Sequence, residues 1–400
     1  MKKFSELLHN IIESKQKEKL TQESLSKLTY LKKHLTNEQV KEIFDNYIYD
    51  NEDYYNNFLI NIDDLTTMLK NKGLTLFGPI KDTSKYILKL FTKNNHESIL
   101  KKIINDYFAK KSLSIDDLET TGNIFNDFCK GWENEAKELA SLTYKATANV
   151  GPYEVLLKFL LQEAGSGQSG DIEISSNKEF EVKCMTWNKS GKSGGHLAGQ
   201  KAYGDSKIRK SWSIYMYLNE NLFHLEKYNN KLADKAAYFQ NNTGFKNFIK
   251  LCEVNKLSNS DIAKGLVNSL CFQYNYITND RDKDGNMSNI PSLSSTIIEE
   301  LYKQTEEKLK TISELSFQDM KNIIGCIQFN LYSFIENFDY IFIGFLSDQI
   351  NKQEQNGKYF FYKKDSTKDI VNFNVITDNL YFGPLETTDQ GRTGKIYLKF

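Results

Sequence analysis

The sequence predicts an α/β protein, in which a helical N-terminal part precedes a short strand-rich centre and a C-terminal part that is first helical and then β-rich. Two observations predict this order. Apolar residues recur with helical spacing up to about residue 145 and again from 226 to 338. Short runs of alternating apolar and polar residues occupy 171–186 and the last sixty residues. A length of 400 residues favours two or three domains, and we place them at 1–145, 146–225 and 226–400.

Composition excludes several classes of protein. The 52 basic and 52 acidic side chains cancel, which argues against a protein that coats nucleic acid by charge alone. No run of about 18 apolar residues is present, and the opening MKKFSELLHN lacks an apolar core, so neither a membrane span nor a secretory signal is expected. Five scattered cysteines without a CxxC pair argue against a disulfide framework or a cysteine zinc site and favour the cytoplasm.

In the N-terminal part, two polar pairs have the spacing of helix caps. Thr36 with Gln39 and Ser114 with Asp117 each precede apolar residues at helical intervals. We therefore expect a helix to start at each pair.

The character of the sequence changes near Gly151. Pro152 suits a first helical turn, and the leucines that follow line one side of a helix. A glycine-rich stretch, 165–170, leads to two predicted strands, 171–174 and 180–186, joined by a turn, and a third strand is expected at 210–218. Helices are expected from 226 to 338, interrupted at 280–291. Mostly antiparallel strands are then expected at 339–346, 358–364, 371–376, 380–384 and 395–400.

The segment that carries chemistry is Asp-x9-Glu-x-Lys, formed by Asp171, Glu181 and Lys183. Side chains alternate along a strand, so Glu181 and Lys183 emerge on one face and their neighbours Phe180, Val182 and Cys184 on the other. A hairpin through 175–179 would bring Asp171 beside that pair. Two carboxylates suit Mg²⁺, which keeps several of its waters. A bound metal activates water and polarises a phosphodiester, while a lysine orients that water or stabilises negative charge.

This arrangement resembles the PD-(D/E)XK nuclease superfamily over residues 150–215, although Gly170 rather than proline precedes Asp171. The resemblance implies a restriction-endonuclease-like mixed-sheet core that hydrolyses DNA with Mg²⁺, for which Mn²⁺ could substitute. Asp171 and Glu181 would hold the metal and Lys183 would position or activate water. It also implies an assisting carboxylate on the preceding helix, where we favour Glu154 over Glu163. Gln200, three residues before Tyr203, resembles the glutamine of the recombination-nuclease branch.

A basic stretch follows the predicted lysine strand. Residues 183–210 include seven basic residues and one acidic residue, and this excess of positive charge suits contact with phosphates. Beyond Lys183 they are Lys189, Lys192, Lys201, Lys207, Arg209 and Lys210. We expect duplex DNA as the partner and a type II-like, site-specific restriction endonuclease as the function, with the large C-terminal region completing the core and recognising DNA. The resemblance implies a homodimer that cuts both strands.

Other readings of the sequence stay open. A virus-encoded recombination or genome-processing nuclease would use the same residues, whereas in a non-catalytic DNA-binding or structural protein they would form a surface ion pair worth at most about 1 kcal/mol. The glycines at 165, 167 and 170 have the order of a dinucleotide fingerprint but follow a helix instead of a strand. The D-x-D-x-D-G run at 280–285 resembles a calcium loop but has Pro291 where a glutamate belongs.

Overall fold

The computed structural model describes residues 60–400 apart from 61, 75, 77–79, 143, 146–148, 167–170, 175–177, 189–190, 194, 197–241, 255, 280–292, 367–368, 384–385, 389–390 and 394. The chain forms two compact units. The first takes in Met1–Asp117, Phe128–Val150 and Val155–Ser166, and the second Leu118–Asp127, Gly151–Glu154 and Gly167–Phe400. The two units therefore interleave along the chain, and the structure is mixed α/β, as the sequence predicts.

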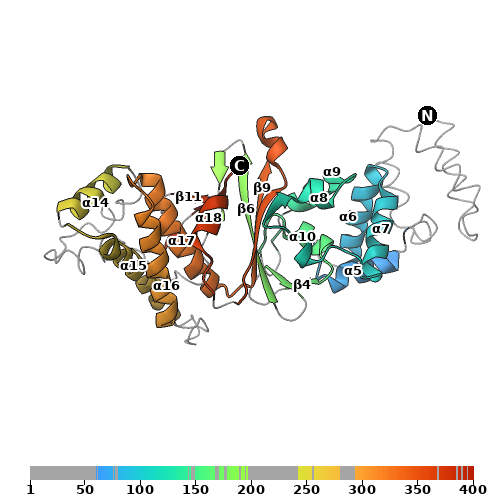
Figure 1. Ribbon diagram of the computed structural model, residues 1–400. Coiled ribbons are helices and arrows are strands. Elements are labelled where there is room, and N and C mark those ends of the chain that lie inside the picture. The colour runs from blue at the N-terminus through green and yellow to red at the C-terminus, as the bar shows by residue number, and fades with distance from the viewer. Residues whose placement is uncertain are drawn as a thin grey trace, which may run out of the picture. The chain divides into compact units, whose positions relative to one another are not determined.

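The described part of the first unit is mainly helical, which confirms the expectation for this region. Three helices, α5, α6 and α7, lie side by side (Figure 1) and bury residues at helical intervals, such as Leu65, Met68 and Leu69 of α5. The elements assigned to this unit are α5 (Ile62–Asn71), α6 (Ile80–Lys93), α7 (Glu97–Phe108), η2 (Ile115–Asp117), α9 (Glu133–Ser141), β2 (Tyr144–Lys145), β3 (Asn149–Val150) and β4 (Ala164–Ser166). Helices α8 (Ile124–Phe128) and α10 (Glu154–Leu160) cross the boundary between the units.

The helix expected to start at Ser114 is only one short turn. The carboxylate of Asp117 accepts a hydrogen bond from the backbone N–H of Ser114 at 2.8 Å, so the predicted polar pair does close locally. It caps the three-residue 3₁₀ helix η2, after which the chain forms β1 (Thr121–Asn123) and joins the sheet of the second unit. The prediction was wrong in extent because the strand partner of β1 lies more than two hundred residues away in sequence. The pair at Thr36 lies outside the described residues.

The sheet of the second unit runs in the order β1-β10-β9-β6-β5, with β7 paired to β6. Its other strands are β5 (Ile172–Ile174), β6 (Lys178–Asn188), β7 (Gly191–Ser193), β9 (Tyr340–Ser347) and β10 (Lys358–Lys363). The predicted pair of central strands is confirmed as an antiparallel hairpin of β5 and β6. Pairing is otherwise antiparallel except between β6 and β9, which run parallel from Phe180 opposite Tyr340 to Trp187 opposite Ser347.

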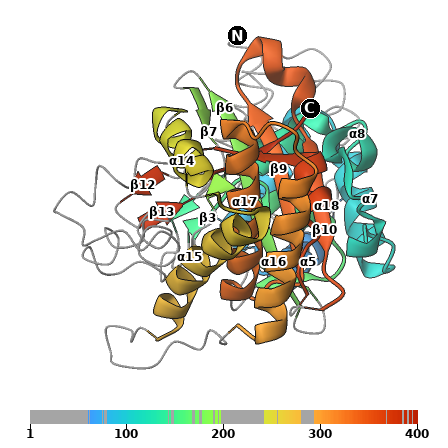
Figure 2. The same ribbon diagram turned by 60° about the vertical axis from the view of Figure 1, so that its left-hand side comes forward.

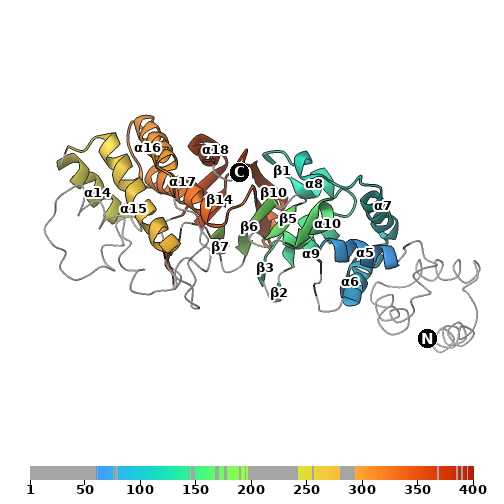
Figure 3. The same ribbon diagram turned by 90° about the horizontal axis from the view of Figure 1, so that it is seen from below.

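Helices cover one face of this sheet. Figures 1 and 3 show α14 (Asn242–Val254), α15 (Asn259–Asn279), α16 (Ser295–Lys310) and α17 (Phe317–Ile335) grouped beside β6 and β9, and Figure 2 shows α16 and α17 in front of the strands. Their apolar residues form one core with Met185, Ile341, Ile343 and Phe345 of the strands. The described residues thus confirm the helices expected between 226 and 338. The expected strand at 210–218 and the D-x-D-x-D-G run at 280–285 lie outside the described residues.

The C-terminal end is β-rich with one correction. Residues 371–376, expected to form a strand, lead instead into α18 (Phe373–Asn379), whose N-cap is Asn372. The side chain of Asn372 accepts a hydrogen bond from the N–H of Asn374 at 2.8 Å, and Phe373, Ile376 and Thr377 are buried at helical spacing. The alternation of apolar and polar residues was misleading because it covers too few residues to distinguish the two-residue period of a strand from the 3.6-residue period of a helix. The remaining strands are β11 (Leu380–Phe382), β12 (Glu386–Thr388), β13 (Gly391–Thr393) and β14 (Lys395–Leu398), with β8 (Gly195–His196) paired to β14.

Candidate functional site

Asp171 reaches the predicted Glu-x-Lys pair through the β5–β6 hairpin. The pairing of Ile172 with Phe180 places Asp171, the residue immediately before β5, level with Glu181. The N–H of Val182 donates a hydrogen bond to Oδ2 of Asp171 at 2.8 Å, and this oxygen lies 4.0 Å from Nζ of Lys183. A carboxylate eleven residues upstream is therefore fixed to the backbone of the strand that carries the other two groups.

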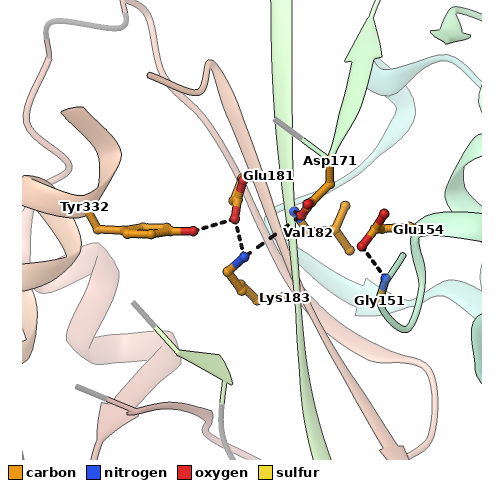
Figure 4. A network of polar contacts seen from close by, with 7 residues as sticks. All are labelled: Gly151, Glu154, Asp171, Glu181, Val182, Lys183 and Tyr332. Carbon is orange, nitrogen blue, oxygen red and sulfur yellow. Dashed lines mark hydrogen bonds and ion pairs between the residues drawn. The ribbon is translucent and has the colours of Figure 1, made fainter. Parts of the chain in front are cut away.

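Glu181 and Lys183 point from the same face of β6 toward α17. Nζ of Lys183 donates a hydrogen bond to Oε1 of Glu181, and the hydroxyl of Tyr332 on α17 donates to the same oxygen. The Lys183 ammonium also lies over the Tyr332 ring, 5.6 Å from its centroid. Figure 4 shows the resulting row, in which Tyr332, Glu181, Lys183 and Asp171 follow one another across the sheet.

Exposure differs along this row. The Glu181 side chain is 4 % exposed, whereas those of Lys183 and Asp171 are 21 % and 26 % exposed. The group therefore has a closed side at Tyr332 and Glu181 and an open side at Asp171 and Lys183. Because Glu181 is buried, the group is not the solvent-exposed ion pair that the non-catalytic reading of the sequence assumed.

The surroundings keep Lys183 charged. Burial by itself lowers the pKa of Lys183, but Glu181, Tyr332 and Asp171 together raise that pKa well above its usual value. Burial and the neighbouring Glu181 likewise raise the pKa of Tyr332 well above the usual value. At neutral pH the site therefore contains a lysine cation and a phenol that keeps its proton.

Glu154, the predicted assisting carboxylate, accepts a hydrogen bond within its own turn and lies on the other side of β6 from Glu181 and Lys183. It is buried at the start of α10, and its Oε1 accepts a hydrogen bond from the N–H of Gly151 at 2.5 Å. The preceding Tyr153 has a left-handed φ of 73°, and its hydroxyl donates to the carbonyl of Phe345 at 2.5 Å. In Figure 4 strand β6 lies between Glu154 and the Glu181–Lys183 pair, so the structure does not bring these side chains together.

Several predicted residues cannot be placed. Gln200 and most of the predicted DNA contacts lie outside the described residues, namely Lys189, Lys201, Lys207, Arg209 and Lys210. Lys192 lies in β7, which pairs with β6 through Trp187 opposite Lys192. Where the chain is described, no three or more His, Cys, Asp or Glu side chains are arranged to hold a metal ion.

Tyr332 is the site residue that sequence reasoning missed. It lies about 150 positions beyond Glu181, in a helix that contains both apolar and polar residues. The one available signal is its hydroxyl among apolar neighbours such as Leu331 and Phe334, because a buried tyrosine hydroxyl requires a polar partner. The sequence could not name that partner.

Comparison of the chain with protein-family models, with curated proteins and with solved structures gave no match. In the described residues no helix combines the length and apolarity needed to cross a bilayer.

Proposed function

We propose that this chain is a Mg²⁺-dependent DNA endonuclease with a restriction-endonuclease-like core. The observation that carries the proposal is the convergence of the Asp171 carboxylate, the Glu181 carboxylate and the Lys183 ammonium at one end of the β5–β6 hairpin. These groups are those needed to hold a hard cation and to stabilise negative charge on a phosphodiester. A type II-like, site-specific restriction endonuclease is the specific form that we propose.

The donor set fits the metal. Mg²⁺ is usually held by one or two carboxylates and keeps several waters, and Asp171 and Glu181 supply two carboxylates. Both contacts of Glu181 to Lys183 and Tyr332 use Oε1 and leave Oε2 outside those bonds. When bound, the metal would activate water and polarise the phosphodiester, and Mn²⁺ could replace Mg²⁺.

Lys183 would position or activate the attacking water. Glu181, Tyr332 and Asp171 raise its pKa against the effect of burial, so the metal-free site holds it as an ammonium. A protonated lysine on the open side of the group can hold a phosphate oxygen and stabilise the negative charge that develops on it. Glu154 and Gln200 remain the residues proposed to assist these three groups.

Duplex DNA is the proposed partner. The basic stretch after β6 would contact phosphates, and a homodimer would allow both strands to be cut. All five cysteines are free, which agrees with the reducing cytoplasm as the proposed location. A recombination or genome-processing nuclease would use the same groups on other DNA structures.

A second candidate function is non-catalytic. The buried Glu181 carboxylate is already paired with Lys183 and Tyr332, which is how a structural network satisfies a buried charge. In that case Lys183 would stabilise the fold of a DNA-binding or structural protein and would contribute nothing to hydrolysis.

Cleavage of supercoiled plasmid separates the two candidates. The purified chain should cut DNA with Mg²⁺ and not with EDTA, and Lys183→Ala should lower the cleavage rate by at least about 100-fold because the charge-stabilising group is lost. Lys178→Ala is the matched control, because Lys178 lies on the same strand and contacts only Tyr340 among the described contacts. A folded protein that shows no metal-dependent cleavage of plasmid, linear, nicked or branched DNA would contradict the nuclease proposal.

Sequencing the cleaved ends then tests the specific form. Ends at one repeated sequence would support a site-specific restriction endonuclease. Scattered ends, or ends only at nicks and branches, would favour the processing nuclease.

A further inference from the structure

Tyr332 lies on a different element from the three sequence-predicted groups and touches two of them. Its hydroxyl donates to Oε1 of Glu181, and its ring lies under the Lys183 ammonium. The residue is buried, 3 % exposed, on α17, and the core on this face of the sheet fixes that helix against β6 and β9. A rigid helix thus holds a rigid side chain against the most buried carboxylate of the site.

We infer that Tyr332 is a positioning residue for the metal ligand Glu181. The inference rests on the proposed function and extends it to a residue of α17. Lys183 and Tyr332 both contact Oε1, so the hydroxyl fixes the rotation of the carboxylate and keeps Oε2 as the oxygen available to a divalent cation. Hydrogen bonds from outside the ligand set orient metal ligands in this way.

Tyr332 also allows Lys183 to leave Glu181 without leaving that carboxylate unpaired. A buried carboxylate needs a donor at all times, and two donors share Oε1 of Glu181. When the Lys183 ammonium turns to a phosphate oxygen on the open side, the tyrosine hydroxyl still satisfies Glu181. Without that hydroxyl, the lysine would be the only described donor to the oxygen and would be held there.

Calorimetric titration of the full chain with Mn²⁺, without DNA, tests the inference. Tyr332→Phe retains the ring and removes only the hydroxyl, and the dissociation constant for Mn²⁺ should rise about 10- to 100-fold. Tyr302→Phe is the matched control, because Tyr302 is a helical tyrosine whose hydroxyl donates to Asn268 outside the site. Its dissociation constant should stay within about twofold of the wild-type value.

The outcomes are distinguishable. If Tyr332→Phe binds Mn²⁺ as tightly as the wild-type chain, Tyr332 is structural only and the inference is wrong. If the wild-type chain does not bind Mn²⁺, or if Glu181→Gln binds Mn²⁺ as well as the wild type does, the nuclease proposal itself fails. The inference then fails with it. If Tyr332→Phe is too unstable for calorimetry, the rise in melting temperature that Mn²⁺ produces can be compared between this variant and the wild-type chain instead. Weaker Mn²⁺ binding gives a smaller rise.

Discussion

At the residue scale, several buried charged side chains are tied to specific partners. The carboxylate of Glu135 is completely buried, and the side chains of Asn94 and His96 contact its Oε1. The ammonium of Lys72, 1 % exposed, donates to the carbonyl of Leu161 and lies 4.9 Å from the centre of the Tyr107 ring. A buried charge is tolerated only with such partners, so removing a partner or a charge has effects that can be measured.

Glu135→Ala should lower the free energy of unfolding by about 1–3 kcal/mol, because the partly buried amide of Asn94 and ring of His96 lose their charged acceptor. Glu138→Ala is the control on the same helix. Its carboxylate accepts a hydrogen bond from Tyr86 at an exposed position, so the loss should stay below about 1 kcal/mol. Urea denaturation measures both, and equal losses would contradict the prediction.

Lys72 should make stability rise with pH. Burial lowers the pKa of Lys72 from 10.5 to about 7, against an opposing effect of Glu163. Between these values the unfolded chain binds a proton that the native chain does not, so the free energy of unfolding increases by roughly 1.4 kcal/mol per pH unit inside this window. Below pH 7 both states hold the proton and the slope from this group vanishes.

The measurement compares the wild-type chain with Lys72→Met by urea denaturation at several pH values. The difference in unfolding free energy between the two chains should shift in favour of the wild type from pH 7 toward pH 10. A difference that does not depend on pH would show that Lys72 keeps its proton in the folded protein.

At the scale of elements, helix α17 carries Tyr332. Contacts at its N-terminus and near its middle define where this helix lies. Ser316 and Asp319 form a capping box, in which each side chain accepts a hydrogen bond from the backbone N–H of the other, at 3.1 and 3.0 Å. Further along the helix, Gly325 faces the ring of Phe382 in β11 so closely that an added Cβ would lie 2.0 Å from it. The cap therefore fixes where the helix begins, and the lack of a side chain at Gly325 allows the helix to pack closely against Phe382 of β11.

Gly325→Ala tests which of two opposing effects prevails. Alanine is favoured over glycine inside a helix by about 1 kcal/mol. The added methyl group would overlap a ring in a packed core, which typically destabilises by about 1–3 kcal/mol. We expect a net loss of stability and, because α17 must shift, weaker Mn²⁺ binding as well. Thermal unfolding followed by circular dichroism checks the first expectation, and a raised melting temperature would contradict it.

At the scale of the whole molecule, the central sheet joins distant parts of the chain. Strand β6 pairs with β9 along its length although about 160 residues separate them, and β1 pairs with β10. The hairpin that carries Asp171, Glu181 and Lys183 therefore depends on residues 340–363 for its neighbours and on α17 for the cover of its face.

The fragment 146–225 should consequently fail to fold by itself. It contains the three predicted site residues but lacks β9, β10 and the helices that bury Met185. We expect no cooperative thermal transition from this fragment by circular dichroism, whereas the full chain should show one. A sharp transition in the fragment would mean that the central segment is an independent domain.

The sequence by itself determined the local features of this protein: the helices with regular apolar spacing, the β5–β6 hairpin, and the common face of Glu181 and Lys183. These follow from periods of 3.6 and 2 residues, which act over a few neighbours. Only the tertiary structure decided that Asp117 ends a short turn, that 371–376 lead into a helix, and that Tyr332 donates to Glu181. The extent of the turn at Asp117 and the Tyr332 contact depend on segments far apart along the chain, which no local pattern encodes, and the alternation at 371–376 covers too few residues to separate a strand from a helix.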